Sequence, residues 1–359
     1  MEAPGLRLLV PGNVRHNSGG NAYNAALLRA LAELGVAAES CGVDGDWPVG
    51  SAADRHRFGR LLTESDAGRV TLVDGLVACG APDELEAAAA AGAAAWILLH
   101  MPLAAHQDLE RRALQAAAGV ICTSTSAAAA VQERHGLHGL ARISVALPGT
   151  EPATAAAGSE PPHLLALAAL LPNKDQLLLL RALAGVTDLP WTASLAGSDT
   201  ADPGYAALLR QESERLSLTE RVRLPGELRG AALDAEWAAA DLSLLISRAE
   251  TYGLVVTESL ARGVPVIVRQ GTGAVEALAT GTPEAAAGTP GAEATALPGA
   301  AVELNADPAP LAALLRRWLT DPELRAQWRA AARAARDHLP GWDATAQAVL
   351  AVLAARPTK

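Results

Sequence analysis

The stretch SRAETYGLVVTESLARGVPVIV (residues 247–268) decides the expected fold. It follows the apolar run DLSLLIS (241–247), which is typical of a buried strand, and it ends in GVPVIV (263–268), which is typical of the next strand. Between these runs, Gly253 opens a helical pattern that ends near Gly263. This order predicts a β-α-β unit. Ligands in such sheets bind beyond the carboxyl ends of the strands and at helix N-termini.

Two carboxylates, Glu250 and Glu258, lie on either side of Gly253. A helix start favours negative charge, so either glutamate could simply complement the helix dipole. On a helical projection, however, Glu258 lies beside Leu254 at the border of the apolar side, where it could accept hydrogen bonds from sugar hydroxyls. Glu250, in the preceding loop, would face the same crevice. Backbone N–H groups from Gly253 to Val255 would donate to a phosphate, which the glycine allows to approach closely.

Short apolar runs alternate with helical patterns along most of the 359 residues. Such alternation predicts parallel sheets covered by helices on both faces. A stretch rich in Pro, Gly, Ser and Thr, residues 147–162, interrupts the alternation and indicates a linker. We therefore expect an α/β protein with two Rossmann-like domains, residues 1–152 and 160–338, and a final helix at 342–356.

Composition and short motifs argue against several classes of protein. The net charge of −10 disfavours a nucleic-acid partner, which would require a basic face. The cysteines are scattered and form no C-x-x-C pair, so we expect a reducing compartment and neither a zinc site nor a disulfide framework. The first apolar run ends at Pro11, too early for a signal peptide, and no apolar stretch reaches transmembrane length. We expect a soluble, cytoplasmic protein.

The loop VPGNVRHNSGGN (10–21) precedes the first helical pattern, and Gly19 and Gly20 within it suit close approach of the backbone to an anion. Its spacing fits neither the G-x-G-x-x-G dinucleotide fingerprint nor the G-K-S/T phosphate loop. NAD and ATP are therefore not the expected ligands.

Taken together, these segments resemble the retaining glycosyltransferases of family 4. The opening stretch resembles that family's signature, and WILLHMPL (96–103) resembles its L-H-x-P-L segment. Further matches occur in the same order along the chain: SGGNAYNAALLRALAELGV (18–36), LPNKDQLLLLRAL (171–183), VRLPGEL (222–228) and GTGAVE (271–276). The resemblance implies the GT-B fold, in which two Rossmann-like domains face each other across a cleft. The first domain would bind the acceptor and the second the nucleotide sugar, with the C-terminal helix crossing back onto the first.

The resemblance also implies a role for individual residues. Glu258 would hold the ribose hydroxyls of the donor, and Glu250 would face the transferred sugar and the reaction centre. Lys174 would be a cation on the diphosphate, although a lysine in this loop is otherwise typically solvated. His100 would face the donor sugar, although a lone histidine at a strand end is often structural. The remaining donor contacts implied are Gly20, near the phosphates, the backbone of Gly253, Leu254 and Val255, and Gly226.

The sequence departs from the family pattern at one place. Many relatives have Gly-Arg where this chain has Ala168 and Ala169, and that arginine also binds the diphosphate. We hypothesise that Arg248 or Arg269 takes its place. No Asp-x-Asp motif stands where a metal-bridged diphosphate would require one, so we expect no metal and no cofactor beyond the donor, a UDP or GDP sugar.

The function that follows is retaining, metal-independent transfer of a sugar from a nucleotide-diphosphate donor to a hydroxyl acceptor. The acceptor is an unidentified small molecule, glycan or lipid, contacted by loops such as 44–60 and 101–110. A GT-B nucleotide-sugar epimerase or phosphorylase, or a non-catalytic nucleotide-sugar-binding protein, remains an alternative. Membrane association is not favoured, because the first helix carries only Arg29 against Glu33 and lacks a basic face.

Overall fold

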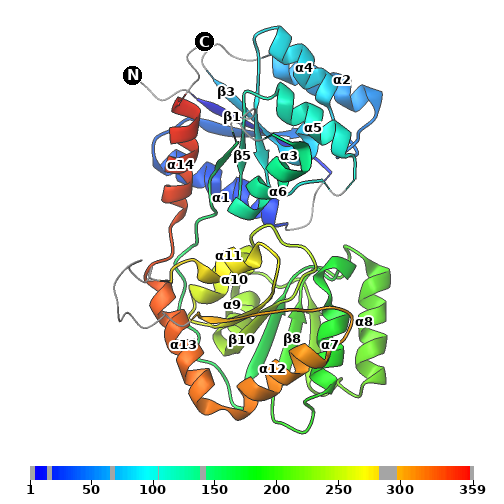
Figure 1. Cartoon of the computed structure of the whole chain (residues 1–359), viewed down its shortest axis with the longest axis vertical. Coiled ribbons are helices and arrows are strands. Elements are labelled where there is room, and N and C mark those ends of the chain that lie inside the picture. The colour runs from blue at the N-terminus through cyan, green and yellow to red at the C-terminus, as the bar shows by residue number, and fades with distance from the viewer. Residues whose placement is uncertain are drawn as a thin grey trace. The chain divides into compact units, whose positions relative to one another are not determined.

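The computed structural model describes residues 5–13, 18–64, 69–103, 105–137, 143–282 and 297–355. The chain divides into two compact units, and each contains a six-stranded sheet with parallel strand pairing throughout (Figure 1). Unit 1 comprises Met1–Gly149 and Pro340–Lys359, and unit 2 comprises Thr150–Leu339. The α/β class expected from the alternation of apolar runs and helical patterns is confirmed.

Unit 1 has the strand order β2-β1-β3-β4-β5-β6. The chain steps from β1 to one side, forms β2, and then continues on the other side, so that the order reverses between β1 and β3. At such a reversal the connections leave the sheet in opposite directions and open a crevice at the carboxyl ends of the strands. The strands are β1 (Leu6–Pro11), β2 (Ala38–Val43), β3 (Val70–Asp74), β4 (Trp96–Leu99), β5 (Gly119–Cys122) and β6 (Ile143–Val145).

Helices cover both faces of this sheet, because successive strand residues point to opposite sides. Leu8 of β1 packs with one layer of helices, whereas its neighbour Leu9 packs with the other. The first layer consists of α1 (Gly19–Glu33) and α14 (Trp342–Ala354). The second consists of α2 (Ala52–Thr63), α3 (Gly75–Ala78), α4 (Pro82–Ala90), α5 (Gln107–Ala116) and α6 (Thr125–His135).

Three helix starts differ from the sequence expectation. The side chain of Ser18 accepts a hydrogen bond from Asn21 N and caps α1, so Gly19 and Gly20 are its first residues rather than part of the preceding loop. The segment 44–60, expected as a loop, becomes helical at Ala52, because Ser51 and Asp54 form a reciprocal capping box. The segment 101–110 likewise enters α5 at Gln107.

The C-terminal helix α14 belongs to unit 1. Its first residue, Trp342, packs edge-on against the ring of Tyr23, with 5.3 Å between ring centroids. Thr345 Oγ1 donates to the carbonyl of Leu147 at 2.8 Å. These contacts join the end of the chain to α1 and to the segment that leaves β6.

Unit 2 has the strand order β12-β11-β10-β7-β8-β9, which reverses between β7 and β10. This is the order of the doubly wound dinucleotide-binding fold. The strands are β7 (His163–Leu167), β8 (Thr192–Ala196), β9 (Val222–Gly226), β10 (Ala240–Leu245), β11 (Val266–Arg269) and β12 (Gly299–Val302). The helices are the short 3-10 turn η1 (Pro172–Lys174), α7 (Gln176–Ala184), α8 (Pro203–Arg215), α9 (Gly230–Ala239), α10 (Leu254–Leu260), α11 (Ala274–Ala279), α12 (Ala309–Thr320) and α13 (Pro322–Arg336).

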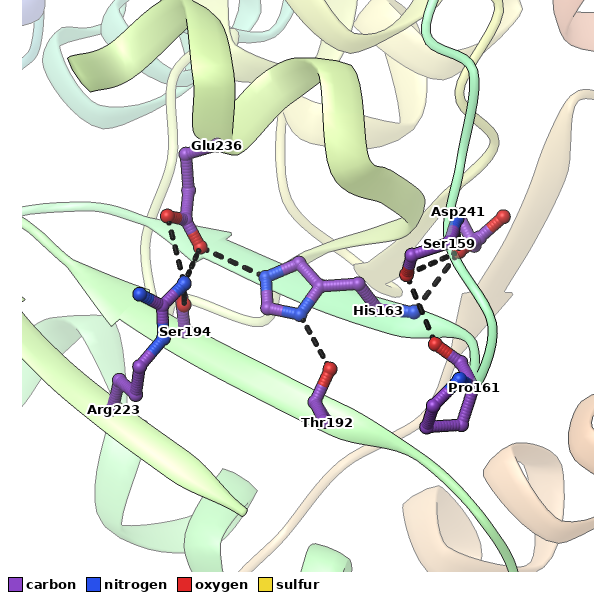
Figure 2. A network of polar contacts seen from close by, with 8 residues as sticks. All are labelled: Ser159, Pro161, His163, Thr192, Ser194, Arg223, Glu236 and Asp241. Atoms are coloured by element: carbon purple, nitrogen blue, oxygen red, sulfur yellow. Dashed lines mark hydrogen bonds and ion pairs between the residues drawn. The ribbon is translucent and has the colours of Figure 1, made fainter. Parts of the chain in front are cut away.

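A polar network lies at the amino ends of the strands of unit 2 (Figure 2). The buried imidazole of His163 contacts Thr192 Oγ1 through Nδ1 and the carboxylate of Glu236 through Nε2, each at 2.8 Å. Arg223 donates to the same carboxylate at 2.9 and 3.0 Å. Asp241 accepts the backbone N–H of His163 at 2.9 Å and thereby fixes the start of β7 against the start of β10. This network joins four strands at the edge opposite the carboxyl ends.

We predict that His163 makes stability depend on pH. Burial lowers the pKa of His163, and the nearby Glu236 carboxylate offsets this only in part. The unfolded chain, with an ordinary histidine pKa of about 6.5, therefore binds protons more readily, and stability falls as pH drops below about 6.5. Thermal unfolding between pH 8 and 5.5 should show a shallower pH dependence for His163→Gln than for the unmodified protein.

The matched control is His56→Gln, because His56 is exposed on α2 of unit 1. It should leave the pH dependence unchanged. Parallel curves for His163→Gln and the unmodified protein would contradict the prediction.

Candidate functional site

Lys174 and Glu250 meet where the strand order of unit 2 reverses. Lys174 lies in the connection after β7, and Glu250 lies in the connection after the neighbouring strand β10. Their side chains form an ion pair, with exposed fractions of 22% and 14%. The structure thus brings together two residues that the sequence analysis chose from separate motifs, at the place in the sheet where ligands bind.

Asp175 fixes the loop that carries Lys174. Its backbone is left-handed, with φ of 57°, and its carboxylate is buried. The carboxylate pairs with Arg248 at 2.9 Å, and it also pairs with Arg269. Asp175 and Arg248 follow β7 and β10, and Arg269 is the last residue of β11, so one carboxylate joins the carboxyl ends of three adjacent strands. The sequence analysis did not select Asp175, because its partners are distant in the sequence.

The two arginines proposed as substitutes for the missing family arginine differ in their surroundings. Arg269 is buried and donates to the carbonyls of Ile246 at 2.9 Å and Leu304 at 2.7 Å in addition to its ion pair. Its guanidinium is therefore used in holding the sheet edge together, which argues against Arg269 as a substitute. Arg248 has a side chain that is 66% exposed and pairs only with Asp175 among the described residues, so it stays a candidate for that role.

Gly253 and Glu258 belong to the helix that follows β10. Gly253 precedes α10 with φ of 92°, and a Cβ there would lie 2.7 Å from Leu245 Cδ2, so the position requires glycine. Leu254 and Val255 are the first residues of α10. Glu258, on its second turn, is half-buried.

The carboxylate of Glu258 lacks a hydrogen-bond donor among the residues that the structure describes. Burial raises the pKa of Glu258, and the nearby Arg262 guanidinium opposes this shift. Polar groups in such surroundings are normally hydrogen-bonded. A carboxylate with a perturbed pKa and no donor is therefore typical of a ligand-binding position.

Gly226 lies farther along the same edge of the sheet. It ends β9, which is separated from β7 by β8, and its carbonyl accepts the N–H of Gly197 at 2.9 Å. Within the described ranges, no hydrogen bond or ion pair joins Gly226 or Glu258 to the Lys174–Glu250 pair. The donor-binding roles of these residues stay predictions.

In unit 1, His100 lies at the carboxyl end of β4 beside two buried polar residues. Its Nε2 is 2.9 Å from Asn24 Oδ1 and 3.4 Å from Asp74 Oδ2. Asn24 Nδ2 donates to Asp74 Oδ2 at 3.0 Å. Burial raises the pKa of Asp74, but the hydrogen bond and charge of His100, with donation from Leu76 and Asn24, outweigh it and lower the pKa overall. Asp74 is therefore ionised.

Gly20 packs directly against the imidazole of His100. A Cβ at position 20 would lie 3.0 Å from His100 Cδ2, closer than most real side-chain contacts. The absence of a side chain thus lets α1 approach the ring. The role of Gly20 near a phosphate, implied by the family resemblance, remains a prediction.

Asp74 and Asn24 were missed by the sequence analysis. Asp74 is the last residue of the run VTLVD (70–74), and Asn24 follows Gly20 by one helical turn. A carboxylate at the end of a predicted parallel strand was the available signal, since such ends gather at one edge of the sheet.

Within the described part of the chain, no group of three or more His, Cys, Asp or Glu residues is arranged to hold a metal ion. None of the helices described there has the length and apolar character needed to span a membrane.

We predict that Asp175→Ala destabilises the protein by about 3 kcal/mol or more, because it leaves the buried Arg269 without its counter-charge. Arg248→Ala removes the exposed partner of the same carboxylate and should cost at most about 1 kcal/mol. Urea-induced unfolding followed by tryptophan fluorescence measures both. Equal losses in the two variants would show that Asp175 does not act through the buried arginine.

Comparison with known proteins identifies the family of unit 2. Residues 150–335, more than half of the 359-residue chain, match the family described as "Glycosyl transferases group 1". A D-inositol 3-phosphate glycosyltransferase of Kineococcus radiotolerans is 34% identical over 200 residues, which are 53% of this chain and 43% of the relative. A mannosylfructose-phosphate synthase of Agrobacterium fabrum is 31% identical over 130 residues, 34% of this chain and 29% of the relative. The matched part therefore spans less than half the length of either relative.

Solved structures match nearly the whole chain. HepE from Anabaena in complex with UDP superposes with a TM-score of 0.68 at 19% identity, covering 98% of this chain and 99% of that chain. Sucrose-phosphate synthase from Thermosynechococcus elongatus gives a TM-score of 0.70 at 18% identity, covering 98% of each chain. At this level of identity the likeness establishes the fold, and these neighbours have the GT-B fold. The chain accordingly belongs to the group 1 glycosyltransferase family and has a GT-B fold.

Proposed function

We propose that this protein transfers a sugar from a nucleotide-diphosphate donor to a hydroxyl acceptor, with retention at the anomeric carbon and without a metal. The observation that carries the proposal is the Lys174–Glu250 pair at the strand-order reversal of the unit that matches the family. UDP is bound in the HepE neighbour, and UDP-glucose in another structure of the same protein, which supports a nucleotide-sugar donor. UDP or GDP is the nucleotide we favour, and we place the reaction in the cytoplasm.

Lys174 has the chemistry to bind the departing diphosphate. A lysine is a compact positive charge on a flexible stem, and it binds phosphate as a point charge. In the structure its charge is balanced by Glu250, so the pair is neutral before the donor arrives. The diphosphate would compete for the ammonium group and leave Glu250 to face the transferred sugar.

Glu258 has the chemistry to bind the ribose. A carboxylate can accept hydrogen bonds from two hydroxyl groups, and such bonds to Glu258 would stabilise the charged form that burial disfavours. The backbone from Gly253 to Val255 would then contact the sugar or the diphosphate.

Retention follows in this proposal from chemistry on one face of the sugar. The C–O bond to the leaving diphosphate breaks, the acceptor oxygen bonds to the anomeric carbon on the same face, and the leaving phosphate takes the acceptor's proton. Glu250 orients and stabilises the sugar without attacking it. The positive charge of Lys174 and the backbone amides stabilise the leaving diphosphate. In other enzymes a metal ion stabilises the same negative charge.

A non-catalytic nucleotide-sugar-binding protein is the second candidate function. The observation in its favour is Ala169, which stands where many relatives have a diphosphate-binding arginine, while Arg269 is held by other partners. Arg248 is then the side chain available to compensate. A GT-B epimerase or phosphorylase would share the donor site and differ in its products.

A donor screen separates these functions. We expect calorimetry with UDP, GDP and ADP sugars to identify one bound donor, and product analysis with that donor to show slow hydrolysis and retention of anomeric configuration. Binding without any turnover, including in the presence of candidate sugar acceptors, would favour the binding protein. An isomerised nucleotide sugar formed without an acceptor would favour the epimerase.

We predict that Glu258→Gln weakens donor binding by about tenfold to a hundredfold, because it replaces charge-assisted hydrogen bonds to the ribose with neutral ones. Calorimetric titration of the donor measures the change. Glu220→Gln is the matched control, since Glu220 is exposed in the same unit and should bind donor normally. Unchanged affinity of Glu258→Gln would remove Glu258 from the donor site.

A further inference from the structure

The contacts around His100 determine which nitrogen of its ring carries hydrogen. Asp74 accepts the backbone N–H of Leu76 at 2.9 Å through Oδ1 and the side-chain amide of Asn24 at 3.0 Å through Oδ2. The lowered pKa of Asp74 keeps this carboxylate ionised, so it accepts hydrogen bonds and donates none. The NH₂ group of Asn24 must therefore face Asp74.

The orientation of Asn24 in turn constrains His100. With its NH₂ group directed at Asp74, Asn24 presents its Oδ1 to His100 Nε2 at 2.9 Å. An amide oxygen accepts hydrogen bonds and cannot donate them. Nε2 must therefore carry the hydrogen, both in the neutral ring and in the charged ring. Asp74 Oδ2, 3.4 Å from Nε2, favours the same arrangement by its charge.

The other nitrogen of the ring is left available. Nδ1 of His100 makes no hydrogen bond with any residue in the described ranges. The ring itself is held in place, because Tyr23 packs edge-on against it with 5.3 Å between centroids and Gly20 lies against Cδ2. In the neutral ring with hydrogen on Nε2, Nδ1 has a lone pair and acts as an acceptor.

We propose that Asp74 and Asn24 are positioning residues that hold His100 in the Nε2–H tautomer, so that Nδ1 accepts a hydrogen bond from a sugar hydroxyl. The part that concerns the sugar rests on the function proposed above. The part that concerns the tautomer rests on the contacts of unit 1 alone. Specificity follows from the arrangement, because a fixed acceptor selects a hydroxyl donor and disfavours a ligand that presents a carbonyl or a carboxylate at this point.

The tautomer is measured directly by nitrogen NMR of the full-length protein labelled with ¹⁵N-histidine, without donor. The spectra are recorded over a series of rising pH, and the tautomer is read once the His100 signals no longer change. His100→Gln identifies the signals of His100 by their loss. We expect a protonated Nε2 and an unprotonated Nδ1. A neutral ring with hydrogen on Nδ1 would overturn the proposal whatever the protein's activity.

The variant Asp74→Asn tests the relay. An asparagine at this position retains an oxygen that can cap α3, but its amide can also donate to Asn24, so Asn24 is free to turn over. We expect His100 to populate both tautomers in this variant. Thr123→Val is the matched control: Thr123 Oγ1 donates to the backbone oxygen of His100 at 3.4 Å, and its removal should leave the Nε2–H tautomer intact. Unchanged His100 signals in folded Asp74→Asn would refute the relay.

Kinetics test the contact with the sugar. With the donor found by the screen, we expect Asp74→Asn to lower kcat in proportion to the loss of the Nε2–H tautomer, by about threefold to tenfold, and Thr123→Val to change it less than about twofold. Normal kcat in an Asp74→Asn protein with mixed tautomers would overturn the sugar contact while leaving the relay in place. If the unmodified protein turns over no nucleotide sugar, the proposed function and this contact fail together, whereas the NMR result still decides the relay.

Discussion

The buried carboxylate of Asp175, shared by two guanidinium groups, is the interaction on which the edge of unit 2 depends. Taking a carboxylate out of water is costly, and the cost is offset only when charged partners surround it. Here Arg269 comes from the end of β11 and Arg248 from the connection after β10, while Asp175 follows β7. Lys174 precedes Asp175 by one residue, and Glu250 follows Arg248 by two. The ion pair proposed to meet the donor is thus held by the ion pairs that hold the strands.

Unit 1 uses a similar device at its own strand-order reversal. Asp74 ends β3, its Oδ1 caps α3, and its Oδ2 faces Asn24 and His100. In both units a buried carboxylate lies near the carboxyl end of a central strand and holds other side chains in place. Asp175 holds two arginines, and Asp74 holds Asn24 and His100. The two units share this arrangement because, at the reversal of strand order, the crossover connections leave the central strands toward opposite faces of the sheet. The polar groups at these strand ends then need hydrogen-bond partners.

The sequence was sufficient to predict those features that depend on local pattern. Alternating apolar runs predicted the two α/β sheets, and the β-α-β unit around Gly253 was placed to within a few residues. Strand order was beyond reach, because buried parallel strands have similar apolar runs wherever they lie in the sheet. The same limit concealed the contact of Asp74 with Asn24 and those of Asp175 with Arg248 and Arg269, which join residues 50 to 94 positions apart along the chain. The helix that begins at Ala52 was missed for another reason. The segment resembles a loop in sequence, but the capping box of Ser51 and Asp54 stabilises a helix start there.

The two edges of the unit 2 sheet place opposite demands on their charged groups. At the amino edge, His163 and Arg223 both contact the carboxylate of Glu236, and no ligand is proposed to displace these contacts. At the carboxyl edge, Lys174 and Glu250 neutralise each other, and in the proposed function the diphosphate of the donor would compete for the lysine. A pair that is too stable would resist the donor, and an absent pair would leave two uncompensated charges in a partly buried place. Under the proposed function, partial exposure would resolve this conflict, because water weakens the ion pair and a diphosphate carrying two or more charges would then displace a single carboxylate.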